Sequence, residues 1–209
     1  RAESVTPAII VSAAYIAAQM LADVASLRIV LLAGFSIDAG TFIYPLTFTL
    51  RDLVHKTAGI KAARVLILAA AAVNLLMAGF FWLVAHLPAD PAVGPQLEFG
   101  IVLSPVWRIV IASIVAEVLS EMIDTENYRL WVQYVTRRYQ WSRVLVSNAI
   151  SVPIDSLTFA WLAFGGILPS KVVWSIVLSN ILIKGLTTVL TLPAIYLVKE
   201  HPGTAGEGR

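Results

Sequence analysis

One stretch of apolar sequence, residues 147–166, carries polar side chains that could bind a small molecule inside a membrane. Asn148, Ser151, Asp155 and Thr158 recur at helical spacing, so on a helix they form one stripe. An acid in the middle of an apolar span is costly, and it normally faces a bundle interior, a water-filled cavity or an opposite charge. The stripe therefore predicts a polar partner opposite Asp155.

Three other apolar segments carry polar stripes of the same kind. They lie at Ser12, Tyr15, Gln19, Asp23 and Ser26, at Ser113, Glu117, Glu121 and Asp124, and at Asn180, Lys184, Thr187 and Thr191. At about 1.5 Å per residue, Gln19, Asn74, Glu117, Asp155 and Lys184 fall in one layer near the middle of the membrane. This layer predicts a single polar cavity between the helices.

Each of these acids allows two interpretations. Asp155 and Lys184 are either a purely structural ion pair or part of a binding site. Glu117 and Glu121 either exchange protons or form the solvated inner end of a helix. Asp52 either contacts a substrate or forms a salt bridge with Arg64.

The composition predicts a membrane protein. Of the 209 residues, 58% are hydrophobic and 13% are charged, against about 25% charged in a typical soluble domain. Six apolar segments are visible, at about 6–27, 40–54, 63–86, 104–123, 144–167 and 172–198. We therefore predict an all-α, polytopic fold in which residues 1–209 form a single domain of six transmembrane helices. The segment 40–54 is short and either spans or re-enters the membrane.

The basic residues predict the orientation. Eleven of them lie in the ends and in the second and fourth connections: Arg1, Arg51, Lys56, Lys61, Arg64, Arg129, Arg137, Arg138, Arg143, Lys199 and Arg209. Only Arg28, Arg108 and Lys171 lie on the opposite side of the membrane in this arrangement. Because Lys and Arg concentrate in cytoplasmic loops, both termini are predicted to be cytoplasmic, in a bacterial inner or plasma membrane.

Several function classes find no support in the sequence. The net charge of +2 comes from short loops and does not predict nucleic-acid binding. With no cysteine there is no thiolate metal site or cysteine nucleophile. The three histidines show no metal-ligand spacing, and no phosphate-binding or dinucleotide-binding glycine motif occurs. We therefore expect no metal, no cofactor and no enzymatic activity.

Four segments resemble one family. The segment 39–64, AGTFIYPLTFTLRDLVHKTAGIKAAR, is similar to the signature of the queuosine precursor transporter family, also called the vitamin uptake transporter-like family. The matching positions are Gly40, Tyr44, Pro45, Leu46, Thr47, Asp52, Gly59, Ala63 and Arg64. The segment 108–130 resembles the family's fourth helix, with Glu121 where a Gln is usual. Residues 147–166 and Lys184 with Leu192–Pro193 resemble its fifth and sixth helices.

The resemblance implies an importer of a 7-deazaguanine (preQ0, preQ1 or queuine) with a fold similar to the substrate-binding subunits of energy-coupling-factor transporters. A carboxylate can accept from the donor edge of such a base, and Asn, Gln or Lys can donate to its acceptor edge. Its flat face suits stacking on Tyr44, Phe48 or Phe159. The candidate substrate-binding residues are Asp155, Lys184, Asn148, Glu117, Glu121, Asp52, Gln19, Tyr44, Phe48 and Phe159.

Two other functions stay open at this point. One is an energy-coupling-factor substrate subunit for another vitamin or nucleobase, working with separate ATPase partners. The other, which the sequence favours less, is an intramembrane enzyme that uses Glu117 or Glu121 with Asp155, although no nucleophile or cofactor motif accompanies these acids. The partners expected are the small-molecule substrate and the lipid bilayer. The sequence leaves open whether the protein forms a homodimer or needs an ATPase module.

Overall fold

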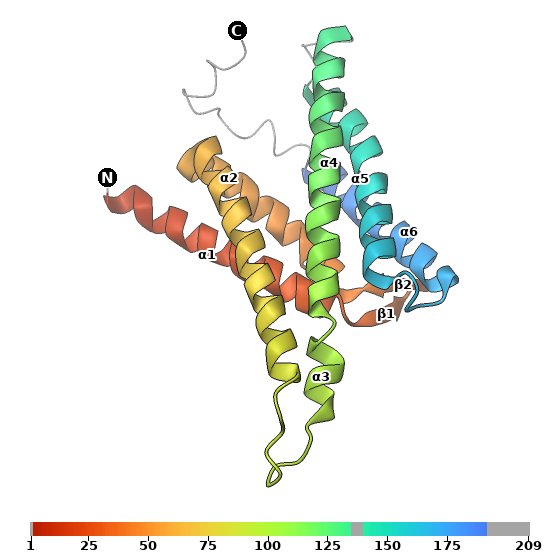
Figure 1. Cartoon of the computed structure of the whole chain (residues 1–209). Helices are drawn as coiled ribbons and strands as arrows, with labels where there is room; N and C mark the ends of the chain where they lie inside the picture. The colour runs from red at the N-terminus through yellow and green to blue at the C-terminus, as the bar shows by residue number, and fades with distance from the viewer. Residues whose placement is uncertain (1, 135–139, 192–209) are drawn as a thin grey trace.

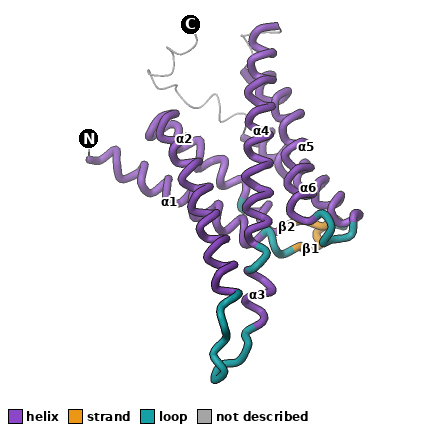
Figure 2. Tube along the Cα trace, in the orientation of Figure 1, coloured by secondary structure: helices purple, strands orange, loops and turns teal. Residues whose placement is uncertain are grey.

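The fold is known from a computed structural model, which describes residues 2–134 and 140–191. Helices make up most of it, and a small β-hairpin follows the first long helix in the chain and lies beside the last one (Figures 1 and 2). The elements are α1 (Ala2–Ala25), β1 (Ile29–Leu32), β2 (Phe35–Asp38), the 3-10 helix η1 (Ala39–Phe42), α2 (Tyr44–Ala85), α3 (Leu97–Leu103), α4 (Val106–Tyr134), α5 (Gln140–Phe164) and α6 (Ser170–Thr191).

The hairpin corrects the all-α prediction. β1 and β2 pair antiparallel, with Ile29 opposite Asp38 and Leu32 opposite Phe35. Ala33 and Gly34 make the two-residue turn, with φ of 50° and 83°. Two consecutive positive φ angles give the tight turn whose twist matches a hairpin. The apolar run 29–38 therefore forms strands, because this turn folds it back on itself.

Helix α2 corrects the predicted boundary between the second and third spans. It has 42 residues, and it includes residues of both segments, 40–54 and 63–86, in one continuous helix. A straight helix of this length would reach about 63 Å, twice the thickness of a hydrocarbon core. Figure 1 shows that α2 bends instead, with an orange arm rising from the hairpin and a yellow arm descending. The two predicted spans correspond to these two arms.

Other boundaries also differ from the prediction. Residues 97–103, expected to lie in a loop, form α3. α4 continues to Tyr134, well past the expected end at residue 123. Helix α6 is described as far as Thr191, so the rest of the predicted span 172–198 lies outside the described residues.

Several helices have the surface of a membrane protein. Three described stretches are long and apolar enough to cross a bilayer: Arg64–Ala85, Leu97–Ser120 and Ser170–Leu190. In the second arm of α2, Leu68 and Leu76 are 72% and 74% exposed, whereas Ala70 and Ala78 are buried. Large apolar side chains outside and small ones inside are typical of helices that face lipid and pack closely on one another. The remaining predicted spans stay predictions.

The apolar core holds α4, α5 and α6 together. Ile109 and Ala112 of α4 pack with Ala160 and Phe164 of α5 and with Ile176 of α6. At one end of this core, the Arg108 guanidinium donates to the Leu162 carbonyl oxygen (2.8 Å) and to that of Gly165. These bonds satisfy carbonyl groups that the end of α5 would otherwise leave unpaired. The packed core fixes the relative positions of α5 and α6, which carry Asp155 and Lys184.

The connections separate into two groups in space. Figure 1 shows the bend of α2 and the far end of α4 at the top of the view. The hairpin, the turn between α5 and α6, and the loop before α3 lie toward the opposite end. The connections that the sequence assigns to the cytoplasm thus lie at one end, and those it assigns to the outside lie at the other.

Candidate functional site

An ion pair links α5 and α6 inside the molecule. The Lys184 ammonium donates to Oδ2 of Asp155, and the two residues are only 6% and 9% exposed. The sequence predicted a polar partner opposite Asp155, and the structure places Lys184 there. Removing one member of such a pair leaves a buried charge unpaired, which costs about 3–5 kcal/mol.

The first residue of α2 completes this group. The Nζ atom of Lys184 lies 4.3 Å from the centroid of the Tyr44 ring, which is the geometry of a cation–π contact. Tyr44 also forms a side-chain hydrogen bond with Ser113 of α4. Residues of α2, α5 and α6 therefore meet around one buried ammonium group, and Tyr44 connects this group to α4.

The local structure of α5 is irregular near Asp155. Pro153 lies inside the helix two residues earlier and has no N–H to donate to the Ala149 carbonyl. Further along the same interface, Asn148 Nδ2 lies 3.4 Å from Thr188 Oγ1. The polar stripe of α5 thus contacts α6 at two positions, Lys184 within the polar stripe of α6 and Thr188 beside it.

A second polar group lies between α1, α2 and α4. Tyr15, Gln19, Asp23, Asn74, Ser113 and Glu117 line one small cavity together with apolar neighbours. Gln19 Nε2 donates to the Tyr15 hydroxyl over 3.0 Å. The volume in which the centre of a water molecule can lie is about 10 Å³. The cavity can therefore hold roughly one water molecule. A nucleobase does not fit there in this conformation.

Tyr44 connects the two polar groups. The charges of Asp155, Glu117 and Asp23 all act on its side chain. The single cavity expected from the sequence is not found: Gln19, Asn74 and Glu117 line the acidic cavity, whereas Asp155 and Lys184 form the ion pair and are not among its lining residues. Glu117 and Asp23 also interact electrostatically with each other.

Residues 36–41 contact α6 and form a third polar group, none of whose members was among the candidate residues. The Ser36 amide donates to Ser175 Oγ (2.8 Å), and the Ser179 hydroxyl donates to the Ser36 carbonyl (3.1 Å). Nearer to Lys184, Thr41 Oγ1 lies 2.7 Å from Asn180 Oδ1. With Tyr44 over Lys184, these contacts fix the start of α2 against α6.

A buried acid, Asp38, anchors the same segment to α1. Its carboxylate accepts from the Ser26 hydroxyl (2.9 Å) and the Thr41 hydroxyl (2.8 Å), and it is 2% exposed. Gly40 makes this close approach feasible, because a Cβ there would collide with Ser26 Oγ and the Ala22 carbonyl. The feature of the sequence that could have indicated this contact is an acid directly before Ala39–Gly40. We expected only the beginning of a span there.

The structure distributes the remaining candidates as follows. Gln19 and Glu117 line the acidic cavity, and Asn148 lies farther along the α5–α6 interface. Phe159 packs in the apolar core, with its ring 5.9 Å from that of Phe164 in an edge-to-face arrangement. The side chains of Phe48, Asp52 and Glu121 lie outside the described part of the structure.

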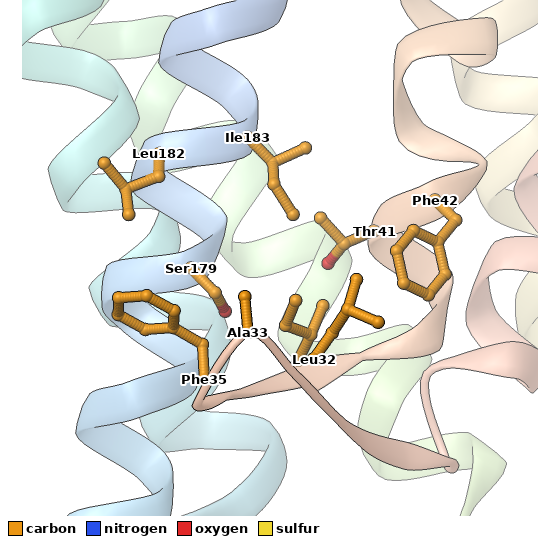
Figure 3. A pocket seen from close by; sticks show the side chains of 9 residues that line it. Leu32, Ala33, Phe35, Thr41, Phe42, Ser179, Leu182 and Ile183 are labelled. Carbon is orange, nitrogen blue, oxygen red and sulfur yellow. The ribbon is translucent and has the colours of Figure 1, made fainter.

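A larger cavity of about 380 Å³ lies between the hairpin and α6 (Figure 3). Leu32 and Phe35 of the hairpin, Phe42 of η1, and Leu182 and Ile183 of α6 surround it. Its lining is almost wholly apolar, and the hydroxyls of Thr41 and Ser179 provide its polar contacts. This cavity has the volume for a small molecule, but it lacks the charged groups that the sequence places in the binding site.

The described side chains provide no evident metal centre. Within residues 2–134 and 140–191, the described His, Asp and Glu side chains nowhere gather in groups of three that could hold a metal ion. Among the described residues, the buried polar side chains are carboxylates, amides, hydroxyls and the Lys184 ammonium, which suit hydrogen bonding to a polar organic molecule.

Comparison with known families supports the resemblance found in the sequence. Residues 38–198, more than half of the chain, match the family described as "Putative vitamin uptake transporter". Searches of curated proteins and of solved structures gave no match. A transporter family is consistent with a role other than catalysis. The matched region holds Asp155, Lys184, Tyr44, Asn74 and Glu117, and the chain belongs to the vitamin uptake transporter family.

Proposed function

We propose that this membrane protein imports a queuosine precursor, a 7-deazaguanine such as preQ0, preQ1 or queuine. The observation that carries the proposal is the buried Asp155–Lys184 pair with Tyr44 beside it. It supplies an acceptor, a donor and an aromatic face within one small region, and these are the three features that recognition of a flat guanine-like base requires.

The two edges of the base match the two charges. A 7-deazaguanine presents adjacent N–H donors on one edge, which a carboxylate such as Asp155 can accept in bidentate fashion. Its carbonyl oxygen is an acceptor, to which the Lys184 ammonium can donate. The ring of Tyr44 offers a face for stacking. A ligand without these groups would leave buried charges unpaired, so the site should reject it strongly.

The proposed transport requires a second conformation. The charged side chains contact each other, and the neighbouring acidic cavity holds about one water, so a base cannot reach the pair as the helices now stand. Transporters expose a central site to each side in turn by moving one group of helices against another. The pair would separate when the base inserts between carboxylate and ammonium.

The membrane arrangement is part of the proposal. We propose six spans, provided by α1, the two arms of α2, α4, α5 and α6, with both termini in the cytoplasm of a bacterial cell. The distribution of Lys and Arg among the connections supports this orientation. So does the grouping of the connections at two ends of the molecule (Figure 1).

Uptake by cells tests the function directly. Cells that can neither make nor import queuosine precursors would express the protein and receive preQ0, preQ1 or queuine in turn, with queuosine in tRNA as the readout. We expect the wild type to restore queuosine and Asp155→Asn to fail. Glu98→Gln, which makes the same acid-to-amide change at an exposed residue of α3, should behave as the wild type. No queuosine with any of the three compounds, despite normal expression, would contradict the proposal.

A second candidate is a substrate-binding subunit of an energy-coupling-factor transporter for another vitamin or nucleobase. The description of the matched family, which refers to vitamin uptake, favours it. The purified chain in liposomes separates the two. Uptake of a deazaguanine by the chain alone supports the first candidate, whereas uptake only after addition of an ATPase module supports the second.

A further inference from the structure

We propose that four buried side chains, where the end of α1 and the start of η1 meet α6, bind one sodium ion. They are Ser26, Asp38, Thr41 and Asn180, and each is at most 5% exposed. The site is separate from the Asp155–Lys184 pair, and it does not depend on the proposed transport of a deazaguanine.

Asp38 is a buried acid without a basic partner. Within the described part of the chain, its carboxylate forms no ion pair with Lys, Arg or His. It also caps no backbone N–H of η1, although Asp38 is the N-cap residue, where such a bond is usual. Its neighbour in the group, Asn180, lies about 15 Å along α6 from Ser170, and α6 is long and apolar enough to cross a bilayer. A lone carboxylate at that depth is costly unless a cation balances its charge.

The group has one more oxygen–oxygen contact than it has protons to fill them. Three contacts form a row: Ser26 Oγ to Asp38 Oδ1 (2.9 Å), Asp38 Oδ2 to Thr41 Oγ1 (2.8 Å), and Thr41 Oγ1 to Asn180 Oδ1 (2.7 Å). An ionised carboxylate and an amide oxygen can only accept, so the two hydroxyls supply two protons for three contacts. Thr41 can donate to Asp38 or to Asn180, but not to both. One cation among these oxygens would satisfy the extra contact and balance the charge of Asp38.

The chemistry of the oxygens selects sodium. Carboxylate, hydroxyl and amide oxygens are hard ligands, which suit alkali and alkaline-earth cations better than transition metals. With one carboxylate, a monovalent ion leaves the site neutral, whereas a divalent ion would leave a positive charge in apolar surroundings. Oxygens that lie 2.7–2.9 Å apart favour the smaller sodium ion over potassium. Such a site differs from a group of three His, Asp or Glu ligands, which the described residues do not form.

The sodium site adjoins both sides of the proposed substrate site. Tyr44 follows Thr41 by three residues, and Lys184 follows Asn180 by four, which is about one helical turn. An ion bound by Thr41 and Asn180 together would hold the beginning of α2 against α6, and so keep Tyr44 over Lys184. This link rests on the proposed function. Sodium and a deazaguanine should then each strengthen the binding of the other by the same factor.

Binding of radioactive sodium to the purified protein tests the site without any deazaguanine. We expect one sodium ion per chain, displaced by unlabelled sodium and not by choline. Asp38→Asn removes the charge and should abolish binding. Thr41→Val keeps the shape but removes one ligand, so affinity should fall by about tenfold.

Asp90→Asn is the matched control, because it makes the same acid-to-amide change in an exposed loop. It should bind sodium as the wild type does. No sodium binding by the wild type, or equal binding by the Asp38→Asn protein, would overturn the proposal. Equally tight binding of potassium would overturn the assignment to sodium.

The melting temperature separates sodium from two other ways of satisfying the row of oxygens. Sodium at 100 times its dissociation constant should raise the melting temperature by about 5 °C over choline, and should have no effect on Asp38→Asn. If sodium has no effect, but the wild type alone loses stability as the pH rises, Asp38 holds a proton instead. If neither sodium nor pH has an effect, the amide group of Asn180 donates to Thr41. Either result would overturn the sodium site.

Equilibrium binding of preQ1 tests the link to the substrate site. Affinity should rise with sodium concentration in the wild type and should not depend on sodium in Asp38→Asn. If sodium binds but preQ1 binds equally well without it, the link is wrong. If sodium binds as expected but no deazaguanine is bound or transported under any condition, the proposed function fails and the sodium site stands.

Discussion

The ammonium of Lys184 is held between the carboxylate of Asp155 and the ring of Tyr44, whose centroid is 4.3 Å from Nζ. This relationship joins α6 to α5 and to the beginning of α2. It also places a cation, an anion and an aromatic face in contact inside the molecule. A ligand that offers donors, an acceptor and a flat ring could replace each of these contacts with one of its own.

The ring of Tyr44, rather than its hydroxyl, should matter for binding. We expect Tyr44→Phe to retain the cation–π contact and to bind preQ1 within a few-fold of the wild type. Tyr44→Leu removes the ring, and a desolvated cation–π contact is worth about 2 kcal/mol, so affinity should fall by about tenfold or more. Equilibrium binding to purified protein measures both variants. Equal affinities for the Phe and Leu variants would exclude a role for the ring.

The close approach of η1 to α1 should be sensitive to a single methyl group. Gly40→Ala places a Cβ against Ser26 Oγ and the Ala22 carbonyl, so the melting temperature in detergent should fall. A rearrangement of this kind costs about 1–3 kcal/mol. Gly79→Ala is the matched control, because a Cβ there meets nothing within 4 Å and alanine favours a helix. A Gly40→Ala protein as stable as Gly79→Ala would show that this contact does not form.

Labelling in intact cells tests the orientation. The chain has no cysteine, so a single introduced cysteine reports its own position. Ala92→Cys, in the loop before α3, should react with an impermeant maleimide in intact cells. Gln140→Cys, at the start of α5, should react only after lysis. The reverse pattern would mean that both termini are outside.

The ion pair could be predicted from the sequence for a simple reason. An acid and a base at similar depth in neighbouring apolar helices reduce their desolvation cost by meeting, and Asp155 and Lys184 do so. The estimated depth of each residue in the membrane also predicted correctly that Gln19, Asn74 and Glu117 lie together, since all three line one cavity. Position along a helix gives depth but not direction around the axis. The sequence therefore did not reveal that the ion pair lies apart from the cavity that Gln19, Asn74 and Glu117 line.

Other features depend on local geometry that hydropathy does not report. The residues of β1 are as apolar as those of a span, those of β2 include Ser36 and Asp38, and hydropathy shows neither the strand pairing nor the turn at Ala33–Gly34. Likewise, the basic residues near the bend of α2 predicted a loop, although Lys, Ala and Arg all favour helix. The contact between Asp38 and Ser26 could not be predicted, because the two residues lie 12 positions apart and meet only in the fold.

The account rests on Asp155 and Lys184 recognising substrate rather than only joining two helices. Asp155→Asn alone leaves Lys184 unpaired, so we expect it to lower stability and to weaken deazaguanine binding by about tenfold to a hundredfold. Combining it with Lys184→Met removes both charges. Replacing a buried ion pair with apolar or neutral groups of similar size is often neutral for stability, so the double variant should fold.

The most direct measurement is therefore deazaguanine binding by the Asp155→Asn/Lys184→Met protein, alongside its melting temperature. We predict a melting temperature close to that of the wild type, together with no measurable binding of preQ0, preQ1 or queuine. A protein that folds and binds all three compounds with wild-type affinity would show that the pair is only structural, and would contradict the proposed site.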